Sequence, residues 1–526
     1  MTRPDRDASE GRPADWAAPG KRLVDSALDD AAAVPALADL GRVHVVGVAG
    51  AGTSALARLL LGRGVAVSGC EARRSAAVTG LRQLGIPVEI GHAVEHVAAA
   101  DTVVFNTALD PDHLEIRAAR ESGTRLLRRA AALASVIGDA TTLAVAGTHG
   151  KTTTSSLLVV GMQACGVDPS FALGGTLYEG GANAHLGTGD LFVVEADESD
   201  GSFLLLHPAA AIVTNVEADH LENHGDLEGI HRAFRHFVDR MTPDALLLVD
   251  VDDAGARRVA EHARATGRRV TGYGSTPDAD VRVVDIEELP DRTRFVVEGL
   301  DTVAASNDVS GVDRPSAPAR LEVTIASLVG AHMARNATGA LAMAARFGLD
   351  VRAMVAAWST FQGVRRRFEF RGEAGGVRVY DDYAHHPTEV AAQLVAARAV
   401  TRATGGRLVG VFQPGTYSRT QTFATEFGEA LGHADVAVVL DVFAARELPL
   451  PGVTGALIAD RVPAEADGHP VTTVYEPSFA AAADRIVEHT ARGDVVVTMG
   501  IGDVHLLCPE ILRLLTARDA NGDPSA

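Results

Sequence analysis

The chain of 526 residues is too long for one hydrophobic core, and at about 150 residues per domain it is expected to form three domains. Its formal charge of −20 disfavours binding to the phosphate backbone of a nucleic acid. No apolar run approaches the ~20 residues that a membrane span needs, and the N-terminus lacks the apolar core of a signal peptide. The sequence therefore predicts a cytoplasmic protein with no nucleic-acid partner and no membrane insertion.

The three cysteines, Cys70, Cys165 and Cys508, lie far apart in the sequence and form no C-x-x-C pair. This spacing favours neither a zinc ribbon nor a disulfide framework. We expect all three to be small buried residues.

The N-terminal part combines a disordered extension, residues 1–38, with an α/β domain at residues 39–139. Within this domain an apolar strand leads into the turn Gly47–Ser54 and an apolar helix. This order is typical of a Rossmann-like dinucleotide site, although Ala49 takes the middle glycine position of G-x-G-x-x-G. A second strand ends near Glu71, where such a domain places its ribose-binding acid. A purely structural turn is an almost equal interpretation.

The clearest motif runs from Leu143 to Thr154, where an apolar strand leads into a glycine turn, a lysine and a hydroxyl-rich helix start. Backbone N–H groups and the helix N-terminus bind phosphate in such loops, while Lys151 can reach the β- and γ-phosphates and Thr152 can ligate Mg²⁺. Val145 replaces the first glycine of the usual pattern. Lysine occurs only at Lys21 and Lys151, although Lys and Arg together number 48. We predict a phosphate-binding loop with an exposed lysine; a chance Gly-Lys turn is the alternative.

Two acidic segments follow later strands of this central domain, which we place at residues 140–362. Glu195–Asp200 and Asn215–His220 each come directly after an apolar strand. Open parallel sheets place ligand sites at the carboxyl ends of their strands, and Mg²⁺ prefers oxygen ligands. Either segment alone is more typical of a solvated loop, but two beside a phosphate loop predict a metal site. Residues 300–320 are polar and Pro/Ser-rich, which indicates a surface insertion.

The last part of the chain predicts a parallel α/β domain at residues 363–517, followed by a tail at 518–526. Strands are expected at residues 377–380, 407–412, 435–440, 471–475 and 494–499. Asp381–Pro387 and Gln413–Arg419 follow two of these strands and predict a substrate site. The His-His-Pro turn could instead be a structural lead-in to a helix capped by Thr388.

These motifs resemble those of the Mur ligases over about residues 39–515, and most closely those of the alanine-adding branch. The matching segments are Gly147–Thr154, Glu195–Asp200, Asn215–His220, Arg366–Phe368, Asp381–Glu389, Phe412–Pro414 and Ser418–Thr420. The resemblance implies an α/β fold of three domains: a Rossmann-like N-terminal domain, a P-loop ATPase-like central domain and a Rossmann-like C-terminal domain.

The resemblance implies ATP-dependent ligation of L-alanine to the lactyl carboxylate of UDP-N-acetylmuramate, through an acyl phosphate, in peptidoglycan synthesis. ATP and Mg²⁺ would be required, and the oligomeric state stays open. One alternative is a paralogous amide ligase that uses another carboxylate or amine, in murein peptide recycling or specialised metabolism. A more remote alternative is a non-catalytic dinucleotide-binding protein.

The resemblance also implies roles for individual residues. Catalysis would depend on Lys151, Glu195, His220, Arg367 and Asp382. ATP would contact Gly147, Thr148, His149, Gly150, Lys151, Thr152, Thr153, Asn336, Arg367 and Asp382. Thr152, Glu195 and His220 would hold Mg²⁺. The UDP substrate would contact Gly50, Gly52, Thr53, Ser54, Thr107 and Arg129, and L-alanine would contact Tyr383, His385 and Arg419.

The sequence departs from the family pattern at four of these motif positions. Ala49 and Thr53 alter the glycine turn of the first domain, and Met333 replaces the first asparagine of a His-Asn-x-x-Asn motif. Gly415 takes the place of a histidine that commonly follows Gln-Pro. Because this last position lies beside the expected amino-acid site, the acceptor amino acid is the part of the function that the motifs determine least.

Overall fold

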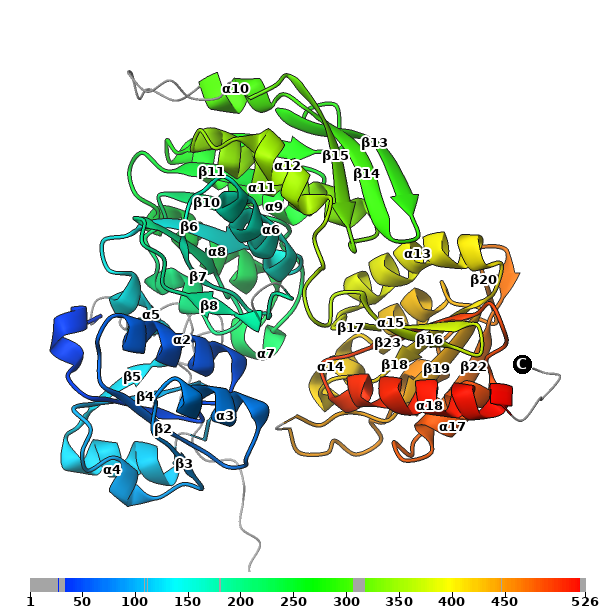
Figure 1. Ribbon diagram of the computed structural model, residues 1–526, viewed down its shortest axis with the longest axis horizontal. Coiled ribbons are helices and arrows are strands. Elements are labelled where there is room, and N and C mark those ends of the chain that lie inside the picture. Colours follow the sequence, from blue (N-terminus) through cyan, green and yellow to red (C-terminus); the bar gives the residue numbers. More distant parts are fainter. Residues whose placement is uncertain are drawn as a thin grey trace, which may run out of the picture.

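The computed structural model describes residue 27 and residues 34–107, 109–110, 112–178, 181–305, 317–445 and 447–520. These residues form three α/β units, which we call the N-terminal, central and C-terminal units (Figure 1). No helix in these ranges is long and apolar enough to cross a membrane. All three cysteines are free; Cys70 and Cys508 are buried as expected, whereas Cys165 is half-buried.

Most of the expected extension and tail lies outside the described residues. Within the expected extension, however, a 3₁₀ helix begins at Leu37 and ends at Leu40. The final helix continues to Ala520, two residues beyond the expected start of the tail at 518. Most of the expected polar insertion, residues 306–316, also lies outside the described residues, and the segment before it forms a helix. The bounds of the three expected domains, 39–139, 140–362 and 363–517, stay a prediction.

The N-terminal unit is a parallel sheet with helices on both faces. Its elements are β1 (Val43–Val46), α2 (Ala51–Gly62), β2 (Val67–Glu71), α3 (Ala76–Gln83), β3 (Val88–Ile90), η2 (Val94–His96), β4 (Thr102–Phe105), α4 (Leu114–Ser122), β5 (Arg125–Arg128) and α5 (Arg129–Ile137). The strand order is β3-β2-β1-β4-β5. Val43 and Val45 of β1 pack in the cluster that contains α2 and α5, whereas Val46 packs with Cys70 on the face covered by α4.

The central unit has a mainly parallel sheet with an antiparallel extension. Its elements are β6 (Thr141–Ala146), α6 (Lys151–Ala164), β7 (Ser170–Ala172), β8 (Ala184–His185), β9 (Leu191–Glu195), η4 (Ser202–Leu205), β10 (Ala210–Val213), α7 (Leu221–His224), α8 (Leu227–Arg240), β11 (Leu246–Asp250), α9 (Ala254–Ala265), β12 (Arg269–Gly274), β13 (Val281–Leu289), β14 (Arg292–Glu298), α10 (Leu300–Ala305), β15 (Arg320–Ala326), α11 (Ala331–Arg346) and α12 (Val351–Trp358). The strand order is β15-β14-β13-β12-β11-β10-β6-β9-β7-β8. Strands β6, β9 and β10 are adjacent, so the phosphate loop and both acidic segments leave the sheet at the same edge.

The C-terminal unit is also an α/β structure, built on a sheet that contains both parallel and antiparallel strands. Its elements are β16 (Glu369–Ala374), β17 (Val377–Asp382), α13 (Pro387–Thr404), β18 (Leu408–Phe412), α14 (Tyr417–Thr422), α15 (Ala424–Leu431), β19 (Val436–Leu440), α16 (Ala456–Ala459), β20 (Glu465–Ala466), β21 (His469–Pro470), β22 (Thr472–Glu476), α17 (Ala482–Glu488), β23 (Val495–Met499), η5 (Asp503–Leu506) and α18 (Leu507–Ala520). The order of the main sheet is β16-β17-β23-β18-β19-β22.

Two details of the C-terminal unit differ from expectation. The sheet is not wholly parallel, because β16 pairs antiparallel with β17. Gly375 and Gly376 join these strands with φ of 56° and 73°, a tight turn that glycine adopts without strain. Helix α13 is capped by His386, which forms a capping box with Glu389, and not by Thr388. Thr388 instead donates a 2.6 Å hydrogen bond to Glu217 of the central unit.

The central unit lies between the other two units and contacts both (Figure 1). Thr107 of the N-terminal unit donates a 2.8 Å hydrogen bond to Asp200 of the central unit. Tyr178 of the central unit donates a 2.6 Å hydrogen bond to Glu369 of the C-terminal unit. One apolar cluster also runs from the N-terminal unit through η4 into the central unit. The loops at the carboxyl edge of the central sheet therefore face neighbours from both sides.

Trp358 offers a test of the central core. Its side chain is fully buried and its Nε1 donates a 3.0 Å hydrogen bond to Leu157 O of α6. We expect Trp358→Ala to lower the free energy of unfolding by about 3–5 kcal/mol, because it leaves a large cavity. Trp358→Phe, which keeps most of the volume, should cost about 1 kcal/mol for the lost hydrogen bond. Urea denaturation followed by circular dichroism measures both, and equal losses would contradict this packing role.

Candidate active site

The predicted phosphate loop joins β6 to α6 through two glycines in left-handed conformations. Gly147 has φ of 129° and Gly150 has φ of 82°. A Cβ atom on Gly147 would lie 2.0 Å from Thr214 Oγ1, so no side chain fits there. Asn215 Oδ1 accepts a 2.7 Å hydrogen bond from the His149 N–H. The loop is thus held from β10, and α6 begins at Lys151 with its N-terminus toward the loop.

Only 13% of the Lys151 side chain is exposed, which corrects the expectation of an exposed loop lysine. Its Nζ donates to Gly147 O at 2.6 Å and to Thr148 O at 3.1 Å. It also forms an ion pair with Glu198 Oε2 at 2.8 Å. Burial disfavours its charge, but Glu198 and Asp197 outweigh burial and raise the pKa of Lys151. The ammonium is therefore fully charged and fixed in position.

Thr152 connects the loop to the first acidic segment and to the C-terminal unit. Its Oγ1 donates a 2.9 Å hydrogen bond to Glu195 Oε1. Glu195 Oε2 accepts from Gly174 N at 2.7 Å, which fixes the carboxylate. Arg367, in the segment before β16, donates a 3.3 Å hydrogen bond from its Nη2 to Thr152 Oγ1. A hydroxyl, a carboxylate and a guanidinium thus meet at the start of α6.

The second acidic segment carries His220 and an ion pair that spans two units. His220 has φ of 51°, and such strain in a non-glycine residue is typical of functional sites. Burial lowers its pKa, but Glu222 and Asp219 outweigh burial and raise it. Asp219 Oδ1 accepts a 2.6 Å hydrogen bond from Arg419 Nη2 of the C-terminal unit. Burial raises the pKa of Asp219, but Arg419 outweighs burial and holds it far below the ordinary value.

The end of β17 supplies a buried carboxylate and an aromatic ring. Asp382 accepts 2.7 Å hydrogen bonds from the N–H groups of Phe368 and Ala384. Burial raises the pKa of Asp382 to about 6. Two guanidinium groups lie over the ring of Tyr383, Arg366 at 5.1 Å and Arg367 at 5.3 Å from its centroid. Asp382 therefore fixes the backbone around these residues, and Tyr383 helps to position Arg367.

His385 lies beside Tyr383 and is neutral at neutral pH. Burial lowers the pKa of His385 to about 4. Its Nδ1 lies 3.0 Å from Tyr383 O and 3.2 Å from Glu389 Oε2. These contacts at Nδ1 fix the orientation of the His385 ring and leave its Nε2 for other hydrogen bonds.

His149 bridges the central and C-terminal units. Its Nδ1 lies 3.2 Å from Glu389 Oε1 of α13, and its Nε2 lies 3.6 Å from Glu217 Oε2. Burial opposes protonation, but the two carboxylates outweigh it and raise the pKa of His149 to about 9. At neutral pH an imidazolium therefore joins two carboxylates from different units.

Two cavities adjoin at this junction. The larger, of about 700 Å³, brings together Lys151, Thr152, Glu195, His220, Arg367, Tyr383 and His385. The smaller, of about 280 Å³, is lined by Thr153, Asn336, Arg367 and Asp382 among others. His149, Gly150, Arg367 and Glu389 line both. Asn336 Oδ1 would lie 2.7 Å from a Cβ on Gly150, so the amide approaches the loop closely.

The residues expected to bind the UDP substrate lie at the boundary between the N-terminal and central units. Thr53 Oγ1 donates a 2.7 Å hydrogen bond to Gly47 O and so closes the glycine turn. Gly52 faces Arg129, because a Cβ there would lie 3.1 Å from Arg129 Cδ. Burial raises the pKa of Asp197, but Lys151, with a smaller contribution from Arg129, lowers it. Thr107 contacts Asp200. Ser54 Oγ donates a 3.1 Å hydrogen bond to Ala51 O of its own helix.

The structure also places the residues at which the sequence departs from the family pattern. Glu71 Oε2 accepts a 3.0 Å hydrogen bond from Ala49 N, so the predicted ribose acid braces the turn itself. Met333 is buried and lines the smaller cavity. A Cβ on Gly415 would lie 2.6 Å from Ile501, so the backbone here lies directly against a side chain from the end of β23. A larger residue at this position would displace Ile501.

Several carboxylates hold the charged groups of the site in place, and the sequence alone indicated no individual role for them. Glu198 pairs with Lys151, Asp219 pairs with Arg419, and Glu217 and Glu389 flank His149. All four lie inside motifs that the sequence singles out. The sequence motifs therefore contain these carboxylates, but a motif does not predict which carboxylate pairs with which cation.

Models of three Mur ligase domains match the chain. The "Mur ligase family, catalytic domain" model matches residues 42–141, the "Mur ligase middle domain" model matches residues 145–344 and the "Mur ligase, glutamate ligase domain" model matches residues 366–502. Together these ranges include every residue assigned to the candidate site.

Curated relatives match nearly the whole chain. The UDP-N-acetylmuramate--L-alanine ligase of Saccharopolyspora erythraea is 50% identical over 489 residues, which cover 92% of this chain and 95% of that protein. The ligase of the same name from Mycolicibacterium gilvum is 49% identical over 91% of this chain and 98% of its own length.

Solved structures show the same fold. The UDP-N-acetylmuramate-alanine ligase of Thermotoga maritima superimposes with a TM-score of 0.71 at 24% identity, over 90% of this chain and 99% of that one. A murein peptide ligase from Psychrobacter arcticus gives a TM-score of 0.64 at 24% identity over the same shares of the two chains.

The bridge made by His149 predicts a pH dependence of stability. The pKa of this group rises from an ordinary value of 6.5 to about 9 on folding. Its stabilising contribution is therefore complete below pH 6.5 and is lost as the pH rises through about 9. We expect the melting temperature of the wild type to fall more steeply over this range than that of His149→Asn. Parallel slopes in thermal unfolding would contradict the bridge.

Proposed function

The chain belongs to the Mur ligase family, and on that premise we propose that it is the ATP-dependent ligase that joins L-alanine to the lactyl carboxylate of UDP-N-acetylmuramate in peptidoglycan synthesis. The observation that carries the proposal is the 50% identity, over 95% of its length, to a relative of that name. The buried lysine, hydroxyl and carboxylates at one cavity support it, because they suit transfer of a phosphoryl group.

The first step would transfer the γ-phosphoryl group of ATP to the lactyl carboxylate and release ADP. We assign the phosphates to the loop Gly147–Thr153 and the start of α6. Lys151 would neutralise the β- and γ-phosphates. Because its ammonium group has only three N–H donors, the phosphates would share these donors with Glu198. Arg367 would add a second cation from the C-terminal unit, and Asn336 and Asp382 would contact the nucleoside in the smaller cavity.

Mg²⁺ fits the oxygen atoms beside the loop. Thr152 Oγ1 and the Glu195 carboxylate lie 2.9 Å apart, and hydroxyl and carboxylate oxygens are the ligands that Mg²⁺ prefers. We propose that Thr152 and Glu195 hold one ion and that His220 contacts a second. The ions would supply neutralisation of the phosphate charge. The protein's part is to hold these side chains in place before the nucleotide arrives.

The second step would form the amide. The amine of L-alanine attacks the acyl phosphate carbon, the C–O bond to phosphate breaks, and the amine gives up a proton. We place the amino acid near Tyr383, His385 and Arg419. His385, neutral because of its pKa of about 4, can accept a hydrogen bond from the amine. Arg419 has a bidentate fork that suits the alanine carboxylate, although one of its nitrogens already pairs with Asp219.

The UDP group is assigned to the N-terminal unit. Its diphosphate would lie at Gly50, Gly52, Thr53 and Ser54, where α2 begins, with Thr107 and Arg129 at the boundary to the central unit. The substrates, ATP and a nucleotide-activated sugar, are intracellular metabolites. We therefore also propose a cytoplasmic location.

One alternative keeps the same chemistry with another substrate. Gly415 lies against Ile501 and takes the place of a histidine that commonly follows Gln-Pro in the family. This favours a paralogue that uses another amine or carboxylate as the second candidate. A non-catalytic dinucleotide-binding role has no comparable support, because the chain retains the charged groups around the phosphate loop.

The role of Lys151 can be separated from its contribution to folding. Lys151→Ala should abolish turnover, and it should also cost about 3–5 kcal/mol of stability because it leaves the buried Glu198 unpaired. In Lys151→Met/Glu198→Gln no buried charge is unpaired, so most of the stability should return while activity does not. Steady-state kinetics and chemical denaturation of both variants measure this. A stable double variant with most of its activity would contradict the phosphate-loop assignment.

The substrate assignment is tested by phosphate release with ATP, Mg²⁺, UDP-N-acetylmuramate and L-Ala, Gly or L-Ser. We expect the highest kcat/KM with L-alanine, and no phosphate release without an amino acid beyond a single turnover. Absence of turnover with UDP-N-acetylmuramate, in folded protein that binds ATP, would overturn the proposal in favour of the paralogue.

A further inference from the structure

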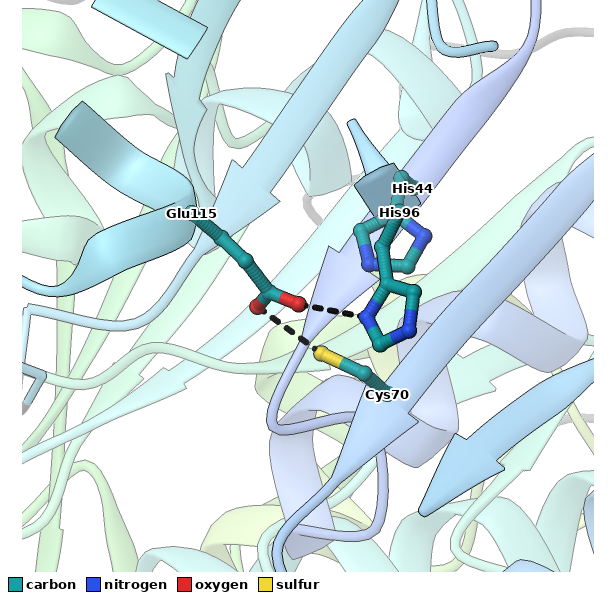
Figure 2. Close-up of side chains that lie close together, drawn as sticks. All are labelled: His44, Cys70, His96 and Glu115. Atoms are coloured by element: carbon teal, nitrogen blue, oxygen red, sulfur yellow. Dashed lines mark hydrogen bonds and ion pairs between the residues drawn. The ribbon is translucent and has the colours of Figure 1, made fainter. Parts of the chain in front are cut away.

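A second group of chemically reactive side chains lies in the N-terminal unit, on the face of its sheet covered by α4. Figure 2 shows four of them, His44 from β1, Cys70 from β2, His96 from η2 and Glu115 from α4, pointing toward one another. One potential ligand atom from each of the four lies within 4.8 Å of the others. None of them has a role in the ligation chemistry proposed above.

Glu115 is the centre of this group. Its side chain is fully buried, and its Oε1 lies 2.7 Å from His96 Nδ1. Its Oε2 accepts a 3.0 Å hydrogen bond from Cys70 Sγ. His92 Nδ1 lies 3.3 Å from the same oxygen, and His113 Nδ1 lies 4.0 Å from it. A buried carboxylate is thus surrounded by a thiol and several imidazole rings, which are all groups that can act as metal ligands.

His44 provides an independent observation. The residue is 2% exposed, and its Nε2 is buried and has no hydrogen-bond partner among the residues that the structure describes. Its Nδ1 lies 3.0 Å from Ser68 Oγ. If Nδ1 donates to this hydroxyl, Nε2 carries a lone pair, which is the arrangement that a second hydrogen bond gives to a metal-binding histidine. A buried nitrogen without a partner is costly unless a ligand completes its coordination.

We propose that His44, Cys70, His96 and Glu115 bind a zinc ion. Zinc accepts this combination of sulfur, nitrogen and oxygen ligands in tetrahedral geometry. Bonds of about 2.0–2.3 Å place tetrahedral ligand atoms roughly 3.3–3.8 Å apart. The contacts of 2.7 and 3.0 Å must therefore lengthen, and separations of up to 4.8 Å must shorten, each by about 1 Å. A thiolate and a carboxylate neutralise the charge of Zn²⁺, with the thiol proton released to solvent. Mg²⁺ is disfavoured by the sulfur and nitrogen ligands.

The surroundings allow entry of the ion and suggest what it does. The side chains of His92, His96 and His113 are 22%, 18% and 15% exposed, so one side of the group opens to solvent. The four ligands come from β1, β2, η2 and α4, and zinc would crosslink these elements. Cys70 O also accepts a 3.0 Å hydrogen bond from Val48 N in the glycine turn. The ion would therefore stabilise the N-terminal unit directly behind the turn that we assign to UDP.

The test uses the full-length protein, stripped of metal and then titrated with Zn²⁺ or Co²⁺ in excess Mg²⁺. We expect one tightly bound zinc ion per chain, a higher melting temperature with zinc, and a thiolate-to-Co²⁺ charge-transfer band. Cys70→Ser should remove this band. It should also lower the zinc affinity by at least roughly 10–100-fold, because even the loss of a residue that only hydrogen-bonds to a metal ligand has an effect of that size. His96→Ala, at a partly exposed ligand, should lower it similarly.

Two control variants separate this site from others. Cys508→Ser removes another buried thiol, in the C-terminal unit, and should leave the cobalt band unchanged. His149→Ala disrupts the group His149, Glu217 and His386 at the unit junction and should also leave it unchanged. Wild-type protein that binds no more zinc than folded Cys70→Ser, or a cobalt complex without a thiolate band, would overturn the proposal and leave the group as a hydrogen-bonded network only.

Discussion

The buried ammonium of Lys151 is the charge on which the arrangement of the central unit depends. A cation in the interior is costly unless opposite charges and hydrogen-bond acceptors surround it. Two loop carbonyls and Glu198 satisfy that requirement, and Asp197 adds to it. The loop after β6 and the acidic segment after β9 are therefore held together in the absence of nucleotide. The phosphates of ATP would enter a site whose positive charge is already in place.

The C-terminal unit completes this site through charged groups that act across the junction. Arg367 reaches Thr152, Arg419 pairs with Asp219, and Glu389 binds the His149 imidazolium. Each pair joins a group of the central unit to one of the C-terminal unit, so the cavity exists only while the two units are in contact. Binding of anionic substrates would compete for the same cations. This competition gives a physical basis for coupling between ligand binding and the contact between units.

The N-terminal unit is organised differently, around a turn and a polar group inside its own layers. Glu71 and Cys70, neighbours at the end of β2, hydrogen-bond to the turn through a carboxylate and a carbonyl respectively. The Cys70 side chain points into the histidine group on the α4 face. The end of β2 thus holds the glycine turn in place through two hydrogen bonds. A ligand bound to Cys70 would therefore also stabilise the turn.

The sequence by itself determined the α/β class, most strands and the position of the predicted phosphate loop between a strand and a helix, because apolar periodicity, glycine turns and the retained lysine are local signals. It could not reveal that Lys151 is buried, that β16 adds an antiparallel edge, or that His386 and not Thr388 caps α13. These outcomes depend on which distant groups meet. The same holds for the group around Glu115, whose members are scattered over more than 70 residues from His44 to Glu115. The pairing of β1 with β2 and the packing of η2 and α4 against the same face of the sheet bring them together.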